Sequence, residues 1–155
     1  MDLLHPGHLD HLEKAAMLGD ELVIIVASDD AYWRKNFCLI PWKERLDMAQ
    51  RLGKWLAGYL GIKVSVIASI DKDGTCAETL KLVHPSIFAK GGDRVSNNMP
   101  KSEIEACREI GCEIRYGVGD LLGSRSRYFV DAMTRVEKYE VVMGNLIRTS
   151  WGSGW

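Results

Sequence analysis

The sequence has no excess of positive charge, no paired cysteine motif and no long apolar run. Its 20 basic and 21 acidic residues give a net charge of −1, which argues against a general nucleic-acid binder because phosphate neutralisation needs a basic surplus. Its four cysteines include no CxxC pair, so the sequence predicts neither a zinc site nor a disulfide framework. No stretch approaches the ~18 apolar residues of a membrane span, and no signal peptide is recognisable. These absences predict a cytoplasmic protein that binds neither membrane nor nucleic acid.

Two histidines flank a Pro-Gly pair near the start of the chain, at His5, Pro6, Gly7 and His8, and an amphipathic run follows. Proline at the first position of a helix loses no hydrogen bond, because its missing N–H would be unpaired there. Glycine lets a phosphate come close to the backbone, and the free N–H groups and dipole of a helix start favour an anion. Imidazoles can donate to phosphate oxygens at neutral pH. The stretch therefore predicts a triphosphate site.

Apolar, β-branched segments alternate with helical patterns along most of the chain. The predicted strands are Leu22–Ala27, Ile62–Ala68, Ser86–Ala89 and Cys112–Tyr116, and the predicted helices begin at Pro6, Pro41 and Thr75 and near Lys101 and Ser124. Alternation at such short intervals predicts an α/β fold with a parallel sheet covered by helices on both faces. Ligand sites in such sheets lie at the carboxyl ends of strands, where Ser28 and Asp29 follow the first one.

The His-x-Gly-His signature at residues 5–8 resembles that of the cytidylyltransferase-like nucleotidyltransferases, and later segments match in the same order. These segments are Leu18–Leu22, Val26–Asp30, Ile40-Pro41 with Glu44-Arg45, and Phe88–Asp93. The resemblance covers roughly residues 2–127 and is closest in pattern to enzymes such as heptose-phosphate adenylyltransferase and glycerol-3-phosphate cytidylyltransferase. It implies a Rossmann-like fold. It also implies transfer of AMP or CMP from ATP or CTP to a small phosphorylated sugar or polyol, with release of pyrophosphate.

The resemblance also implies roles for individual residues. The implied catalytic residues are His5, His8 and Lys35; the implied nucleotide-binding residues are Asp2, Leu3, Leu4, Gly7, Lys90, Gly91, Asp93, Ser124 and Ser126; and Arg34 and Arg127 are implied to bind the acceptor or a phosphate. Mg²⁺ is implied by the triphosphate rather than by a set of protein ligands. A glycine turn after Lys90, a plain helix cap at Ser124 and a solvated basic loop at Arg34 stay open as structural alternatives.

The first strand of the resembling family is missing from the sequence. In that family a central strand precedes the histidine signature, whereas this sequence begins at Met1. Without it, two strands would expose facing rows of N–H and C=O groups. Either the sequence is part of a longer protein, or another segment fills this position. We therefore expect a nucleotidyltransferase domain over residues 1–138 and a C-terminal tail over 139–155, in which Tyr139–Asn145 has the composition of an added strand. An edge strand and a loose tail are the alternatives.

The residues leave several points open. They do not decide between ATP and CTP or identify the acceptor, and both a monomer and a homodimer fit the sequence. The family carries Gly-Arg-Pro after the position of Lys35, where this sequence has Asn36-Phe37-Cys38, so one expected cation is absent. Because this cation and the first strand are missing, a nucleotide-binding module without turnover is the alternative to an enzyme. We expect His11 to be an exposed helix residue and Arg45 to be an ion-pairing residue of secondary importance.

Overall fold

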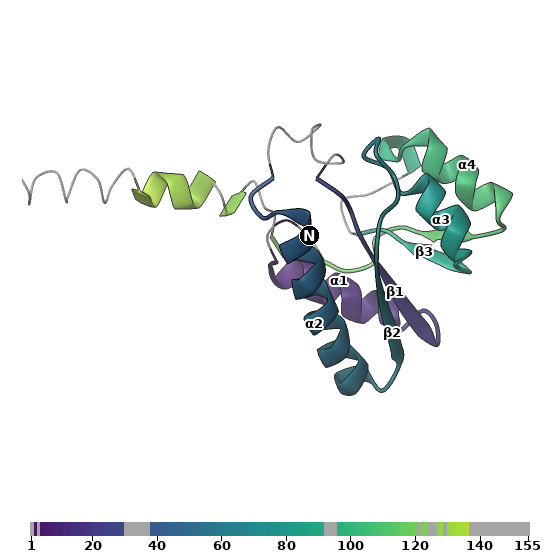
Figure 1. Cartoon of the computed structure of the whole chain (residues 1–155), viewed down its shortest axis with the longest axis horizontal. Coiled ribbons are helices and arrows are strands. Elements are labelled where there is room, and N and C mark those ends of the chain that lie inside the picture. Colours follow the sequence, from purple (N-terminus) through teal and green to yellow (C-terminus); the bar gives the residue numbers. More distant parts are fainter. Residues whose placement is uncertain are drawn as a thin grey trace, which may run out of the picture. The chain divides into compact units, whose positions relative to one another are not determined.

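Figure 1 shows the protein as a computed structural model, in which residues 2, 4–29, 38–91, 96–120, 122–123, 127–128 and 130–136 are described. The chain divides into two units, Met1–Leu122 and Gly123–Trp155. In the second unit, residues 127–128 and 130–136 are helical, as expected for the helix near Ser124. The expected boundary after residue 138 and the expected tail strand lie outside the described residues, so both remain predictions.

The first unit begins with α1 (Pro6–Ala16), β1 (Glu21–Val26), α2 (Trp42–Leu60) and β2 (Lys63–Ala68). The two strands pair in parallel, with Leu22 opposite Val64. A two-residue turn cannot join parallel strands, so the 19-residue helix α2 makes the crossover. It packs closely on β2, because a Cβ added at Gly53 would lie 2.8 Å from Val66 Cγ2.

The first unit continues with α3 (Ala77–Val83), β3 (Ile87–Ala89), the short 3₁₀ helix η2 (Ser96–Asn98), α4 (Lys101–Glu109) and β4 (Glu113–Arg115). β3 and β4 form a second parallel pair, with Ile87 opposite Glu113. Figure 1 shows α3 and α4 close to this pair, and the two helices contact each other. The expected α/β class is therefore confirmed, with the strands in two separate pairs.

Helix α3 begins two residues later than the sequence predicted. Thr75 is not its first residue, because the Thr75 N–H and hydroxyl both donate to Asp73 Oδ1, at 3.0 and 2.7 Å. The cap is instead supplied from the preceding segment, since the buried Asp71 carboxylate accepts the Glu78 N–H at 2.8 Å and the Thr79 N–H at 3.0 Å. A carboxylate that accepts N–H groups at a helix start satisfies donors that have no partner within the helix.

The alternating side chains of β1 reach two hydrophobic clusters. Leu22, Ile24 and Val26 are buried in a cluster with residues of α1 and α2. Ile25, from the opposite face of the strand, packs against a second cluster that includes Leu80 of α3. Both faces of β1 are therefore covered, as in parallel sheets generally, and this confirms the expected Rossmann-like arrangement. Ahead of α1, the described residues Asp2, Leu4 and His5 belong to no strand.

Candidate active site

The start of α1 brings the two signature histidines together. His5 is the N-cap residue, Pro6 follows at the first helical position, and the first turn contains no acidic residue. The His8 N–H donates to the His5 carbonyl at 2.8 Å, and the two imidazole centroids lie 3.8 Å apart. Burial lowers the pKa of His5, which favours the neutral imidazole at pH 7. The helix start thus presents two imidazoles and a favourable dipole to an anion.

Arg45 holds both ends of the segment that carries Arg34 and Lys35. Its side chain is fully buried: Nε donates to the Ile40 carbonyl at 2.8 Å, and Nη1 donates to the Ala27 carbonyl at 2.7 Å. Nη2 forms an ion pair with Asp29 Oδ1 at 2.5 Å. Arg45 was expected to be an ion-pairing residue of secondary importance, but its partner Asp29 lies 16 positions away in the sequence, beyond the reach of pairing along one helix.

The Asp29 carboxylate is held charged at this junction. Although burial opposes the effect, hydrogen bonds from Arg45, from the Trp42 N–H at 3.2 Å and from Cys38 hold the pKa of Asp29 below its usual value. Asp29 directly follows Ser28 at the carboxyl end of β1. An anionic carboxylate next to a buried guanidinium fixes the position of the chain where it leaves the sheet.

Asp2 binds the chain at Leu39 and Ile40, where the segment that carries Arg34 and Lys35 ends. Its buried carboxylate oxygen Oδ1 accepts the Leu39 N–H at 2.9 Å and the Ile40 N–H at 3.0 Å. The thiol of Cys38 also donates to it, at 3.3 Å. Asp2 was expected to bind nucleotide, and in the structure its carboxylate accepts hydrogen bonds from Cys38, Leu39 and Ile40.

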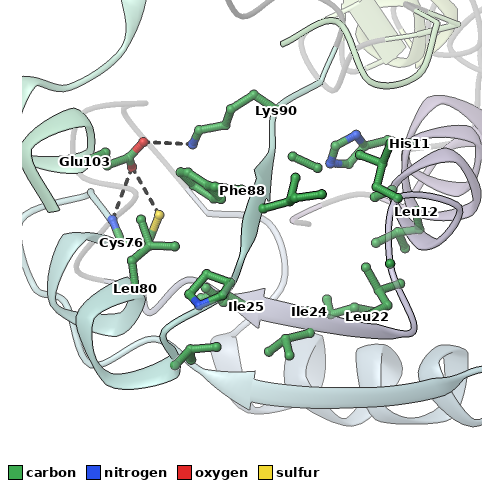
Figure 2. A pocket seen from close by; sticks show the side chains of 18 of the residues that line it. His11, Leu12, Leu22, Ile24, Ile25, Cys76, Leu80, Phe88, Lys90 and Glu103 are labelled. Atoms are coloured by element: carbon green, nitrogen blue, oxygen red, sulfur yellow. Dashed lines mark hydrogen bonds and ion pairs between the residues drawn. The ribbon is translucent and has the colours of Figure 1, made fainter. Parts of the chain in front are cut away.

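Lys90, at the end of β3, is paired inside the protein. Its ammonium lies 2.8 Å from Glu103 Oε2 and 4.2 Å from the centre of the Phe88 ring. Glu103, in the first turn of α4, is buried and accepts the Cys76 N–H at 3.2 Å through Oε1. Figure 2 shows this network, in which Glu103 joins the end of β3 to the start of α3. Burial, and then the Glu103 charge, raise the pKa of the Cys76 thiol, so Cys76 stays protonated at neutral pH.

A short segment after β4 fastens α1 to the end of β3. The Val118 N–H donates to the Lys90 carbonyl at 2.9 Å, and its own carbonyl accepts from His11 Nδ1 at 2.6 Å. The Asp120 N–H donates to Asp10 Oδ2, also at 2.6 Å. Between them, Gly119 has φ +93°, and a Cβ there would lie 2.7 Å from the His11 Cα. The expectation that His11 is an exposed helix residue is therefore wrong, since its ring is bonded to Val118. Helical spacing could not reveal this partner, because it lies 107 residues away in the sequence.

Comparison with known proteins identifies the family. The profile described as cytidylyltransferase-like matches residues 1–149. The chain belongs to the cytidylyltransferase-like family. It is 49% identical over 131 residues to a protein of Methanosphaerula palustris named FAD synthase, which covers 83% of this chain and 79% of that protein.

Other relatives match a smaller part of this chain. FAD synthases of Methanosarcina barkeri and Methanohalophilus mahii are 38% and 35% identical over 96 and 94 residues, respectively. These matches cover 62% and 61% of this chain, and the chain spans only 62% and 59% of the length of those two proteins. A solved structure, the lipopolysaccharide core biosynthesis protein of Thermoplasma volcanium GSS1, shares the fold with a TM-score of 0.53 at 21% identity, covering 77% of this chain and 88% of that one.

Three expected site residues of this cytidylyltransferase-like chain line a common cavity of about 940 Å³: His8, Lys90 and Gly91. Of the remaining predicted residues in the first unit, His5, Leu4 and Gly7 lie at the start of α1, beside His8 in sequence. Arg127 lies in the second unit, where its Nε is 3.8 Å from Asp131 Oδ2. The other predicted site residues lie outside the described residues: Leu3, Arg34, Lys35, Asp93, Ser124 and Ser126.

The described residues offer no cluster of three or more His, Cys, Asp or Glu side chains arranged to hold a metal ion. Mg²⁺ commonly keeps several waters and binds through substrate phosphates with only one or two carboxylates. A Mg²⁺ ion that entered with a triphosphate would need no such cluster from the protein. Among the same residues, no helix combines the length and the apolar character needed to cross a membrane.

Proposed function

We propose that this protein transfers AMP from ATP to the phosphate of FMN, which yields FAD and pyrophosphate. The observation that carries the proposal is the 49% identity, over 83% of this chain, to a protein named FAD synthase. FAD consists of FMN joined to AMP through a pyrophosphate bond, so its synthesis by nucleotidyl transfer uses ATP and FMN. The proposal replaces the sugar or polyol phosphate that the sequence suggested as acceptor, and it favours ATP over CTP.

The reaction needs alignment and charge stabilisation more than covalent help. An oxygen of the FMN phosphate attacks the α-phosphorus of ATP, the bond from that phosphorus to the bridging oxygen breaks, and pyrophosphate carries away the bonding electrons. Negative charge develops on the equatorial and leaving oxygens. We assign its stabilisation to the N–H groups of His5 and His8 and to the dipole at the start of α1, which carries no acidic residue in its first turn.

The surrounding contacts would hold these groups in place. The segment after β4 bonds both to α1, through His11, and to the carbonyl of Lys90. This arrangement fixes the histidine pair relative to the end of β3, where Gly91 leaves backbone room for a nucleotide. Since the Lys90 ammonium already pairs with Glu103, we assign Lys90 a positioning role at this edge rather than a free charge for the phosphates. When bound, Mg²⁺ would neutralise part of the triphosphate charge.

A matrix of substrates tests the proposal. The purified protein is incubated with ATP or CTP, each combined with FMN, glycerol 3-phosphate or a sugar phosphate, and pyrophosphate release is measured. We expect release only with ATP and FMN, with FAD as the product by mass spectrometry. Nucleotide binding without release in every combination would contradict the proposal and favour a binding module without turnover.

A histidine variant and a control variant sharpen this experiment. His8→Ala removes a donor from the helix start and should lower the rate by about 10²–10³-fold. Met17→Ala is the control, because Met17 lies at the end of the same helix, is 76% exposed and is not among the residues that line the cavity. An equal loss in both variants would show that the His8 effect is not specific to the site.

A further inference from the structure

Helix α2 carries exposed apolar side chains that the proposed reaction does not use. Its core side includes the buried residues Gly53 and Leu56, whereas Met48, Trp55 and Tyr59 are exposed on another side. The rings of Trp55 and Tyr59 stack, with centroids 5.1 Å apart and planes at 7°, yet 52% of Trp55 and 63% of Tyr59 remain exposed. Clustered apolar side chains with a charged rim mark contact surfaces, and Trp and Tyr are enriched at the centres of such surfaces.

Exposed residues of α2 follow the spacing of a helix–helix contact. Steps of 4, 3, 4 and 3 positions separate the residues that we call the α2 face: Glu44, Met48, Arg51, Trp55 and Gly58, all exposed. This spacing aligns side chains along one side of a helix, as in pairs of packed helices. Among the described residues, no atom of another element lies within 4 Å of a Cβ placed at Gly58, so a second backbone can come close there. A convex row of this kind suits another helix better than a small molecule, which needs a concave site.

The charges on and beside the α2 face indicate what binds it. Exposed acidic residues, Glu44 and Asp47, lie in the first half of the helix, and exposed basic residues, Arg51 and Lys54, lie in the second half. Lys43 lies outside the face, because one position turns the helix by about 100° from Glu44. Arg51 already pairs with Asp47 at 2.9 Å, and both side chains remain largely exposed, so both can reach a second molecule. A second α2 laid antiparallel places each acidic half opposite a basic half, whereas a parallel one places like charges together.

We propose that two copies of this chain associate through the α2 face, with their α2 helices antiparallel about a two-fold axis. Such an interface uses the same surface on both copies, which the charge order along α2 allows, and the opposed helix dipoles favour it. A crossing near Arg51 brings the Trp55–Tyr59 stack of each copy toward Met48 of the other, and a thioether packs favourably against an aromatic ring. One helix face is a small interface, so the dimer is weak and dissociates at low micromolar concentration.

Sedimentation equilibrium of the full chain, from low micromolar to submillimolar concentration and without substrates, tests the inference. We expect the average mass to rise from 17.4 kDa toward twice that value. Trp55→Glu places a charge in the α2 face and should raise the dissociation constant at least tenfold. Leu82→Glu is the matched control, because Leu82 is an exposed apolar residue of α3, and it should leave the constant unchanged. Circular dichroism should be the same for all three proteins, because both replaced side chains are exposed.

Charge variants test the antiparallel arrangement. Glu44→Lys/Asp47→Lys makes both halves of the surface basic, and Arg51→Glu/Lys54→Glu makes both acidic. Each variant alone should be monomeric where the wild type is dimeric, and an equal mixture of the two should form a dimer again.

Three results would overturn the inference. Association that Trp55→Glu does not weaken would use another surface, and association unchanged in both charge variants would exclude the antiparallel arrangement. A wild-type chain that stays monomeric at every concentration would leave the α2 face to the second unit of the chain or to a different protein. None of these measurements depends on catalytic activity, so failure here is distinct from failure of the proposed function.

Discussion

Replacing Arg45 with methionine should loosen the junction between β1 and α2. Methionine keeps the length and apolar stem of the side chain but cannot donate to the Ile40 and Ala27 carbonyls, which Arg45 binds at 2.8 and 2.7 Å. A buried acceptor left unpaired, such as the Ala27 carbonyl, costs about 1–3 kcal/mol. The Ile40 carbonyl keeps the Cys38 thiol as a donor at 3.0 Å, so the hydrogen bond lost there costs about 1 kcal/mol more. The Asp29 side chain is 44% exposed and regains water, so we assign its loss little weight. The expected cost is about 2–4 kcal/mol, a large share of the ~5–15 kcal/mol that stabilises a typical domain.

Urea unfolding at pH 7 measures this cost. The midpoint should fall by about 1–2 M urea in Arg45→Met, given typical slopes of about 1–3 kcal/mol per M. Arg51→Met is the matched control, because Arg51 lies on the same helix and forms only an exposed pair with Asp47, with a side chain 78% exposed. Its midpoint should hardly change. Equal shifts in the two variants, or no shift in Arg45→Met, would refute the role assigned to Arg45.

Wild type and Arg45→Met should also differ in how their unfolding midpoints depend on pH. The pKa of Asp29 is lowered in the folded state, so the charged carboxylate stabilises the fold above its unfolded pKa of about 3.9. That contribution is lost as the pH falls through the lower, folded pKa. In Arg45→Met the Asp29 carboxylate loses the Arg45 hydrogen bond, so its contribution to stability is smaller. The difference in midpoint between wild type and Arg45→Met should therefore narrow as the pH is lowered from 6 toward 3, and a constant difference would argue against the Asp29 pair.

Two further predictions concern the contacts that hold α1 and β3. Gly119→Ala should lower the thermal midpoint more than Gly111→Ala, because both glycines have positive φ but only the Gly119 Cβ would meet the His11 backbone, at 2.7 Å; equal shifts would contradict the close approach. Glu103→Gln should cost about 3–5 kcal/mol in urea unfolding, since it leaves the largely buried Lys90 ammonium without a counter-charge. The double variant Lys90→Met/Glu103→Gln should cost less than the two single variants combined, and additive costs would contradict the pairing.

The sequence predicted the elements that depend on local patterns. The β-branched run at Leu22–Ala27 became β1 at Glu21–Val26, shifted by one residue, and the predicted helix near Lys101 became α4, because the spacing of apolar residues is visible within each segment. The histidine pair was also predictable, since Pro6 and Gly7 fix a helix start locally. These features need no knowledge of distant contacts.

The contacts that fix the candidate site were not predictable from local patterns. Arg45 binds Asp29 across 16 residues, and His11 binds Val118 across 107. Glu103 pairs with Lys90 from a separate helix, and its buried carboxylate resembles any acidic residue in the first turn of a helix. A single sequence shows which side chains can form such pairs, but the choice of partner depends on how the sheet and helices pack.

Transfer of label from ATP tests the central claim most directly. With α-³²P-labelled ATP and FMN, we expect the label to enter the flavin product, whereas with γ-³²P-labelled ATP it should leave as pyrophosphate. This pattern requires attack at the α-phosphorus, as proposed for the helix start at His5 and His8. Label from the γ-position in the flavin product, or no label in it from either position, would contradict nucleotidyl transfer to FMN.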